Sequence, residues 1–391
     1  MRCIVLILAL LISACANFSH QVKPFNLNDI PSPPISSQLF IDSSNVVVEI
    51  DDVFRLTKAQ QEDFFKYYNR PKNRNLYPNK RIYQYLTEKM KGFNFYSDTL
   101  TANEAISQKL GNCLSLAIVT HSLATLVGVE VQYELVETPP IYQREGEFVL
   151  SSQHVQTLLF EPEPGDFYGQ APLWRGFIRV DYYPAQGTET LRKVSTKEFY
   201  AMFYRNKAAE AMTKADYEVA FQYLRKALEL IKNDNQAINM MAIIHERKGH
   251  SEKAEELYLY ALEYGRKDEQ FELLFNYHLF LESQGRHSEA LEIQRKIAYQ
   301  QNKNPYKWVN LGDSAFAHKD YSSALGFYRK ALKLADYLHE PYAGIAKAQY
   351  QLGNVKGALR NFKKAIDKSH DDSIKKLYFL KYNLLKKRVS S

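Results

Sequence analysis

A single cysteine opens the most apolar stretch in the middle of the chain. Cys113 follows Gly111 and Asn112 in the run GNCLSLAIVTHSLATLVGVEV. The residues after it are apolar on nearly every side, which indicates a buried central helix with Cys113 in its first turn. Free backbone N–H groups and the positive end of the helix dipole favour a thiolate there, so we expect the pKa of the thiol to fall below about 8.5. The same N–H groups, with the amide of Asn112 as a further donor, could hold an oxyanion formed during attack on a carbonyl.

A nucleophilic thiol needs a base. His121 is on the same helix, but eight residues further along the chain it lies about 12 Å away along the axis, which is too far. His154 stands at the start of the alternating run QHVQTLLF, and Asp181 follows in GFIRVDYYP. If these strands are neighbours, Asp181 can orient the imidazole of His154. The structural alternatives are a packed Cys113, an exposed His154, and an Asp181 that pairs with Arg179 or caps a turn.

Helices and strands are predicted around these residues. TKAQQEDFFKYY and TANEAISQKLG each begin with a capping box, Thr57 with Gln60 and Thr101 with Glu104, and NKRIYQYLTEKMKG is a further helix. NVVVEI, at 45–50, is strand-like. After the cysteine helix, the strand-like runs VEVQYELVE, QHVQTLLFE and GFIRVDYYP are separated by turn residues. The pattern therefore predicts helices followed by an antiparallel sheet, an α+β domain.

The order and context of these residues resemble the transglutaminase-like superfamily, a branch of the papain-like fold. The resemblance covers about residues 95–185 and rests on GNC opening an apolar helix, LATLVGVEVQYELV, HVQTLL and RVDYYP. It implies a catalytic set of Cys113, His154 and Asp181 in a domain over residues 46–195. Many crosslinking members carry an aromatic residue after the cysteine and a proline after the aspartate, and this chain has leucine and tyrosine there. The resemblance therefore favours thiol-dependent acyl transfer or amide and peptide hydrolysis over glutamine–lysine crosslinking.

Beyond residue 200 a motif recurs at nearly constant spacing, with a period of about 34 residues. It is aligned on five alanines, which are Ala220, Ala254, Ala290, Ala324 and Ala358. This period, with Trp308, Leu311 and Gly312 in WVNLGDSA, resembles the tetratricopeptide (TPR) repeat. The resemblance covers residues 204–370 in five repeats. It implies an all-α solenoid over residues 200–391 that takes a protein or peptide partner in its concave groove.

Two parts of the repeat array are atypical. In the third repeat, Gln294 and Ile297 replace the usual aromatic and small residues, so we expect looser packing there. The helix expected at about 372–388 looks like a cap for the last repeat. Its covering residues would be Ile374, Leu377, Phe379, Leu380, Leu384 and Leu385. A membrane-surface role for this basic, amphipathic helix is the alternative.

The chain begins like a secreted protein. MRCIVLILALLISACANF has one arginine and an apolar run too short to span a bilayer, which is typical of a signal peptide. Its end resembles a bacterial lipobox, so residues 1–14 are the predicted signal, Cys15 the lipidated residue and 15–45 a flexible tether. An ordinary secretory signal is the alternative. Ala16 favours the outer membrane, facing the periplasm, and Cys113 would be the one free thiol of the mature chain.

Composition limits the other classes. The 391 residues exceed what one core usually holds, and 45% hydrophobic and 24% charged residues are typical of a globular protein. The net charge of +7 is interleaved with acids and does not indicate nucleic-acid binding. No metal-ligand spacing or cofactor fingerprint occurs, so no metal and no cofactor are predicted.

The expected fold is an α+β papain/transglutaminase-like domain followed by an all-α TPR solenoid. The expected function is that of an envelope-anchored lipoprotein with a Cys-His-Asp site and repeats that recruit a partner or substrate. A catalytically inert scaffold that acts through its repeats is the alternative.

Overall fold

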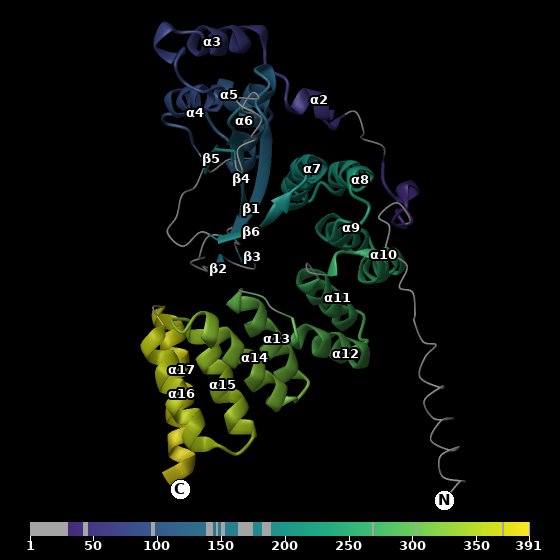
Figure 1. The fold of residues 1–391 in the computed structure, drawn as a ribbon. Coiled ribbons are helices and arrows are strands. Elements are labelled where there is room, and N and C mark those ends of the chain that lie inside the picture. The colour runs from purple at the N-terminus through teal and green to yellow at the C-terminus, as the bar shows by residue number, and fades with distance from the viewer. Residues whose placement is uncertain are drawn as a thin grey trace, which may run out of the picture.

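The computed structural model has helices and a small sheet in its first half and paired helices in its second (Figure 1). It describes residues 30–41, 46–94, 98–137, 144–145, 148–149, 153–162, 175–181, 189–267, 270–300, 302, 304–369 and 371–390. The predicted signal peptide and Cys15 lie outside these ranges. Among the described residues, no helix has both the length and the apolarity that a bilayer crossing needs.

The first half begins with short helices around one buried helix. Their bounds are η2 (Ser37–Leu39), α2 (Ile50–Val53), α3 (Lys58–Tyr68), η4 (Pro71–Asn73), α4 (Pro78–Lys89), α5 (Ala102–Gln108) and α6 (Cys113–Leu126). Both predicted capping boxes are confirmed, at Thr57 with Gln60 and at Thr101 with Glu104. Ten of the residues of α6 are buried, and they lie on all of its sides. The central helix predicted from the apolar run is therefore confirmed.

An antiparallel sheet packs against α6. It contains β1 (Val131–Glu137), β4 (Gln153–Phe160), β5 (Phe177–Val180) and β6 (Glu189–Val194), in the order β5-β4-β1-β6. A separate hairpin is formed by β2 (Arg144–Glu145) and β3 (Phe148–Val149). The three predicted strands are present, but β6 was not predicted, because its sequence ETLRKV has little apolar alternation. Helices followed by a small antiparallel sheet are confirmed, and the papain-like assignment stays a prediction.

Residues 30–41 and 46–49 form a strap that lies against the repeats. Ile30 and Phe40 are buried, and the ring of Phe40 stacks on Phe221 with 4.1 Å between ring centroids. The tether predicted for residues 15–45 is therefore shorter than expected. Its described part is packed, because its apolar side chains find partners on the repeats.

The strap is also held by hydrogen bonds to its carbonyl oxygens. Tyrosine hydroxyls of the repeats donate to Pro31 (from Tyr260, 2.7 Å), Val46 (from Tyr223, 3.2 Å) and Val48 (from Tyr204, 3.2 Å). The strand predicted at 45–50 is wrong for this reason: backbone acceptors there are satisfied by side chains instead of a neighbouring strand.

The second half is a solenoid of helix pairs (Figure 1). The pairs are α7 (Thr196–Thr213) with α8 (Tyr217–Leu230), α9 (Asn235–Arg247) with α10 (Ser251–Tyr264), α11 (Phe271–Ser283) with α12 (His287–Ala298), α13 (Pro305–Ala317) with α14 (Tyr321–Leu334), and α15 (His339–Gln351) with α16 (Val355–Lys368), followed by α17 (Asp372–Ser390). All five aligned alanines lie on the second helix of their pair and are fully buried. The predicted all-helical, TPR-like solenoid is confirmed.

One continuous apolar core joins the sheet to the first repeats. The ring of Tyr133, on β1, stacks on that of Phe199, on α7, with 3.9 Å between centroids and 9° between planes. His121 and Phe54 add stacked and tilted ring contacts to this cluster. The α+β region and the solenoid therefore share buried surface and do not form two separate cores.

The terminal helix covers the last repeat only in part. Tyr378 and Leu385 are buried against it, and Ile374 packs there partly buried. Four of the residues that we expected to cover the repeat are about half exposed: Leu377, Phe379, Leu380 and Leu384. One face of α17 thus packs on the last repeat, and the other face, which we also expected to cover it, leaves its apolar side chains half exposed.

Two glycines allow the fourth and fifth repeats to approach closely. The ring of Tyr328, on α14, lies between Gly312 and Gly344, on α13 and α15. A Cβ atom added at Gly312 would lie 2.5 Å from this ring, and one added at Gly344 would lie closer still. The hydroxyl of Tyr328 donates to Asp313 at 2.7 Å, so the ring cannot swing away without losing that bond.

We therefore expect Gly344→Ala to destabilise the protein by about 1–3 kcal/mol, because the added methyl overpacks the Tyr328 ring. Gly326→Ala is the matched control, since Gly326 lies on α14 and a Cβ added there would meet nothing within 4 Å. It should be neutral or stabilise by up to about 1 kcal/mol through helix propensity. Urea unfolding followed by circular dichroism measures both, and equal effects of the two substitutions would contradict the close-approach argument.

Candidate functional site

The start of α6 is shaped by a capping box. Asn112 is the N-cap: its Oδ1 accepts from the Ser115 backbone N–H at 3.0 Å, and the Ser115 hydroxyl accepts from the backbone N–H of Asn112. Gly111 has φ +147°, and a Cβ there would lie 2.7 Å from the Ser115 Cβ. The glycine and asparagine of the GNC motif are thus explained by the turn that begins the helix. The Asn112 Nδ2, which we expected as an oxyanion donor, donates to Thr99 Oγ1 at 2.7 Å.

Cys113 is free and partly buried at the first position of α6. Burial raises the pKa of the Cys113 thiol, a backbone hydrogen bond opposes this rise, and the negative charge of Asp181 adds to it. The expected lowering of the pKa is therefore not found. Desolvation of the thiolate outweighs the favourable helix end in this state.

The sheet places two of the predicted catalytic residues on neighbouring strands, with His154 on β4 and Asp181 just after β5. A turn at Gly128 joins α6 to β1, and β4 then pairs antiparallel with β1. Near the start of β4, the backbone of His154 lies opposite Val136. β5 ends beside the middle of β4, with Val180 opposite Thr157, and Asp181 follows it. The side chain of His154 lies outside the described part of the structure, so its contact with Cys113 stays a prediction.

The carboxylate of Asp181 has a defined partner on the neighbouring strand. The Nε2 of Gln156, a buried residue on β4, donates to Asp181 Oδ2 at 2.5 Å. Arg179 pairs with Glu134 instead, at 3.2 Å. Gln156 was missed from the sequence, although its place two residues after His154 in an alternating strand puts both on the same face. Its Oε1 is buried with no hydrogen-bond partner among the described residues.

His121 is not available as a base for this thiol. It contacts the Tyr133 hydroxyl through Nδ1 and lies among the aromatic rings between α6 and α7. Burial lowers the pKa of His121 to about 4, so the imidazole is neutral at pH 7. Its role is to join the sheet and the first repeat, in agreement with its distance along the helix from Cys113.

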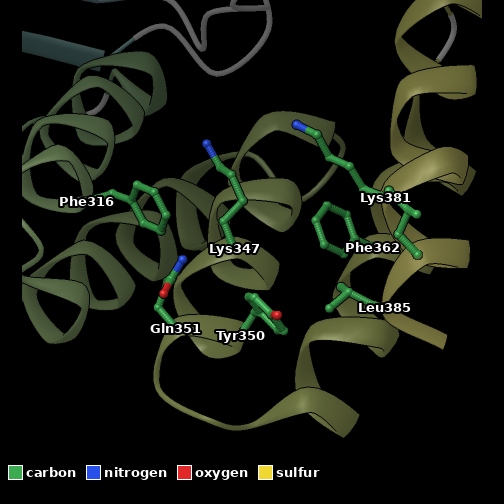
Figure 2. Close-up of a pocket in the computed structure, with 8 residues that line it drawn as sticks. Phe316, Lys347, Tyr350, Gln351, Phe362, Lys381 and Leu385 are labelled. Atoms are coloured by element: carbon green, nitrogen blue, oxygen red, sulfur yellow. The ribbon is translucent and has the colours of Figure 1, made fainter. Parts of the chain in front are cut away.

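A second site is a hollow at the end of the solenoid. The cavity has a volume of about 290 Å³ and is lined by Phe316, Lys347, Tyr350, Gln351, Phe362, Lys381, Leu384 and Leu385. Its walls include α13 and α15, which are the first helices of the last two pairs, and α17, which follows the last pair. Figure 2 shows aromatic rings from different helices facing the hollow, with the amino groups of Lys347 and Lys381 on the same side of it. Such a mixture of apolar walls and few polar groups is typical of a ligand site.

The comparisons with known proteins find similarity to the repeats. The family model described as tetratricopeptide repeat matches residues 239–305. No curated protein matches the sequence.

Several solved structures resemble the solenoid. A structure titled for pilF of Pseudomonas aeruginosa is 20% identical and covers 50% of this chain and 94% of its own, with a TM-score of 0.39. The MamA protein is 17% identical over 43% of this chain and 91% of its own, with a TM-score of 0.36. YrrB, titled as a TPR protein with an unusual peptide-binding site, is 19% identical over 45% of this chain and 89% of its own, with a TM-score of 0.36.

The electrostatic effect of Asp181 on Cys113 gives a test that separates two roles of the thiol. In a full chain carrying Cys3→Ser and Cys15→Ser, Cys113 is the only thiol. If the thiol is isolated, Asp181→Asn removes a charge that raises its pKa, so alkylation at pH 8 should become faster. If His154 and Asp181 form a catalytic set with Cys113, the same substitution should slow alkylation, because the imidazolium partner is lost. Asp367→Asn, exposed on α16, is the control and should leave the rate unchanged.

Proposed function

We propose that this protein is a scaffold that binds an extended segment of a partner protein at the C-terminal end of its repeat solenoid. The single observation that carries the proposal is the hollow between α13, α15, α16 and α17. TPR-like solenoids present such surfaces because each repeat contacts only its neighbours and leaves one face open. Leu384, one of the four apolar residues of α17 that remain about half exposed, lines this hollow.

The lining indicates which kind of segment fits. Leu384 is 57% exposed, and Phe316 and Tyr350 offer aromatic surface, which suits an apolar side chain of the ligand. Lys347 and Lys381 add positive charge beside it. Lys347 Nζ lies 3.5 Å from Asp313 Oδ1, and the Asp313 side chain is about half exposed. Because such an exposed ion pair contributes little stability, the carboxylate of a ligand can replace Asp313 at little cost. The favoured ligand is therefore a peptide with an apolar anchor next to a carboxylate.

The thiol site is a second candidate function, and a specific observation favours it. Asp181 lies close enough to Cys113 for its charge to act on the thiol, as expected for members of one site. In this proposal the Cys113 sulfur attacks an amide or ester carbonyl, His154 takes the thiol proton and returns it to the leaving group, and Asp181 orients the imidazole. Water or an amine then releases the acyl group. Since burial raises the pKa of the thiol, proton transfer to His154 would have to accompany the attack.

The place of action is proposed from the sequence alone. A lipid anchor on Cys15, in the outer membrane facing the periplasm, would hold the scaffold in the bacterial envelope. In that setting the repeats would select the protein that the thiol site acts on, or simply keep it near the membrane.

Selection from a peptide library tests the scaffold proposal. Full-length protein should enrich peptides that combine an apolar residue with an acidic residue or a free C-terminus. Leu384→Asp and Lys381→Glu should each weaken binding of a selected peptide at least tenfold, because they place a negative charge on the apolar wall or reverse the positive one. Lys363→Glu, exposed on α16 outside the hollow, should change the Kd less than twofold. Equal losses in all three variants would mean that only overall charge matters, and the proposal would be wrong.

A further inference from the structure

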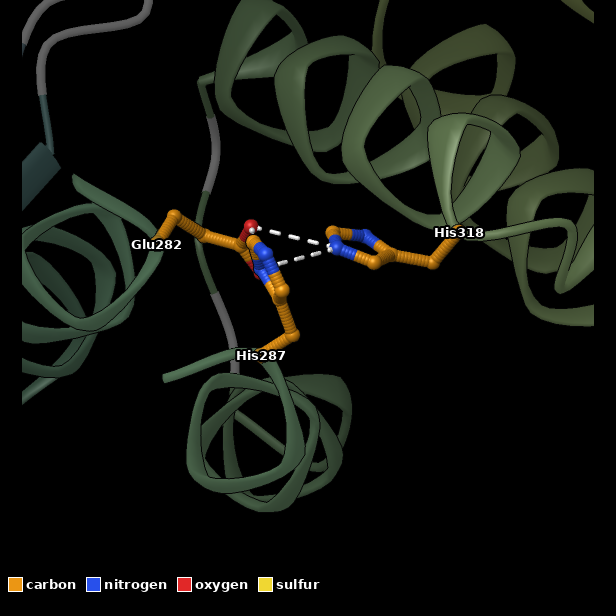
Figure 3. Close-up of side chains that lie close together, drawn as sticks. All are labelled: Glu282, His287 and His318. Carbon is orange, nitrogen blue, oxygen red and sulfur yellow. Dashed lines mark hydrogen bonds and ion pairs between the residues drawn. The ribbon is translucent and has the colours of Figure 1, made fainter. Parts of the chain in front are cut away.

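Three potential metal ligands meet at the junction between the third and fourth repeats (Figure 3). Glu282 comes from the last turn of α11, His287 is the first residue of α12, and His318 is the C-cap of α13. Their ligand atoms all lie within 4.8 Å of one another. Since His318 belongs to the next repeat along the chain, only the folded solenoid brings the three residues together.

The distances match those between ligands of one small cation. Glu282 Oε2 lies 3.0 Å from His287 Nδ1 and 3.2 Å from His318 Nε2. The two nitrogens, His287 Nδ1 and His318 Nε2, are 3.3 Å apart. For metal–ligand bonds of 2.0–2.1 Å, adjacent ligands of a tetrahedral ion are separated by about 3.3 Å. A cation on the open side of this triangle would therefore reach all three atoms with little movement.

The imidazole of His318 is already oriented for such a role. Its Nδ1 lies 2.9 Å from the backbone carbonyl of Ser314, so this nitrogen must carry the proton. A neutral His318 then points the lone pair of Nε2 at the carboxylate of Glu282, an unfavourable contact that either a proton or a cation between them would relieve. A hydrogen bond from the second ring nitrogen to a carbonyl is the usual support of a metal-binding histidine.

The carboxylate of Glu282 is not neutralised by a lysine or arginine among the described residues. Its side chain is only 20% exposed, and its Oε1 has no hydrogen-bond partner in the same part of the structure. The nearest arginine in sequence, Arg286, is held by Glu289 and Glu255, each at 2.6 Å. His287 is 56% exposed, which leaves one side of the cluster open to water or a further ligand.

We infer that Glu282, His287 and His318 form a binding site for a divalent transition-metal ion, with Zn²⁺ as the best fit. Two imidazoles and one carboxylate are ligands that zinc accepts, and three protein ligands leave a fourth position for water or a partner's side chain. Ca²⁺ and Mg²⁺ prefer oxygen ligands and are excluded by this donor set.

The site lies where the solenoid is packed with polar groups. Gln294, the atypical residue of the third repeat, is buried and donates to the Leu311 carbonyl at 3.4 Å across the same junction. His278 Nε2 lies 3.2 Å from Ser314 Oγ, next to the carbonyl that orients His318. A bound ion would link α11 and α12 to α13 directly. It would thus hold the third and fourth repeats at a fixed angle, at a junction where buried hydrogen bonds accompany the apolar packing.

Titration with Co²⁺ and Zn²⁺ tests the inference. The protein is the full chain without a polyhistidine tag and with Cys3→Ser, Cys15→Ser and Cys113→Ser, so that no thiolate can bind the ion. We expect one equivalent of Co²⁺ to give the visible absorption of a four- or five-coordinate site and Zn²⁺ to displace it. His287→Gln and His318→Gln should each weaken binding at least tenfold. His339→Gln is the matched control, a partly buried histidine beside Glu340 that has no third ligand among the described residues, and it should bind the ion like the parent chain.

Two results would overturn the inference. The first is binding that the His287 and His318 variants leave unchanged. The second is the lack of any Co²⁺ signal up to about 1 mM ion, far weaker than a protein zinc site. Glu282→Gln keeps the shape of the cluster and removes its charge, so it tests the site even if a histidine variant unfolds. Circular dichroism of each metal-free variant shows that folding is retained, and Mg²⁺ in place of Zn²⁺ should give no response.

Discussion

The architecture depends on the close approach of helices at small residues that recur with the repeat. The aligned alanines leave no side chain beyond a methyl group where paired helices touch, and at Tyr328 the neighbouring repeats approach so closely that two glycines are needed. This constraint fixes the angle between successive helix pairs. This angle determines which residues of neighbouring repeats come into contact along the edges of the solenoid and how wide its open face is. The hollow at α17 and the Glu282 cluster are both products of that geometry.

The cysteine shows how two physical effects at one position compete. A helix start offers N–H groups and a positive dipole end, and both favour a thiolate. The same helix is the most deeply buried one in the first half of the chain, and removal of water disfavours any charge there. With Asp181 nearby, burial prevails and the pKa of Cys113 rises. A low-pKa nucleophile at this position would need a positive partner, which is the role that the sequence assigns to His154.

Much of the fold could be predicted because it is encoded locally. Capping boxes such as Thr57 with Gln60 depend on four neighbouring residues, and the solenoid depends on a period that can be counted. The strap could not be predicted, since its short apolar segment looks like a strand until the tyrosines of the repeats are placed beside it. The strand β6 was missed because an edge strand with charged residues lacks an alternating pattern.

The sites were predictable to different degrees. Cys113, His154 and Asp181 were chosen from their types and order. The structure places Asp181 near enough for its charge to act on the thiol, but the electrostatic balance at Cys113 depends on burial that no motif encodes. The Glu282 cluster was missed because its two histidines belong to different repeats and are far apart in the sequence. The repeat itself contains the signal: the C-cap of a first helix meets the start of the second helix in the preceding pair, as Lys248 meets Glu218. Comparing residues at these two places in every repeat would have brought His287 and His318 together.

The strap has a mechanical consequence. It crosses from α10 past α8 to α7, and its side-chain and carbonyl contacts are spread over two helix pairs. A pull on the chain at residue 30 would act on these contacts first, because they precede α2 along the chain. The force would pass into the solenoid before it reached the sheet or the thiol. The repeats would therefore bear a load on the start of the chain before the sheet that carries His154 and the helix that carries Cys113.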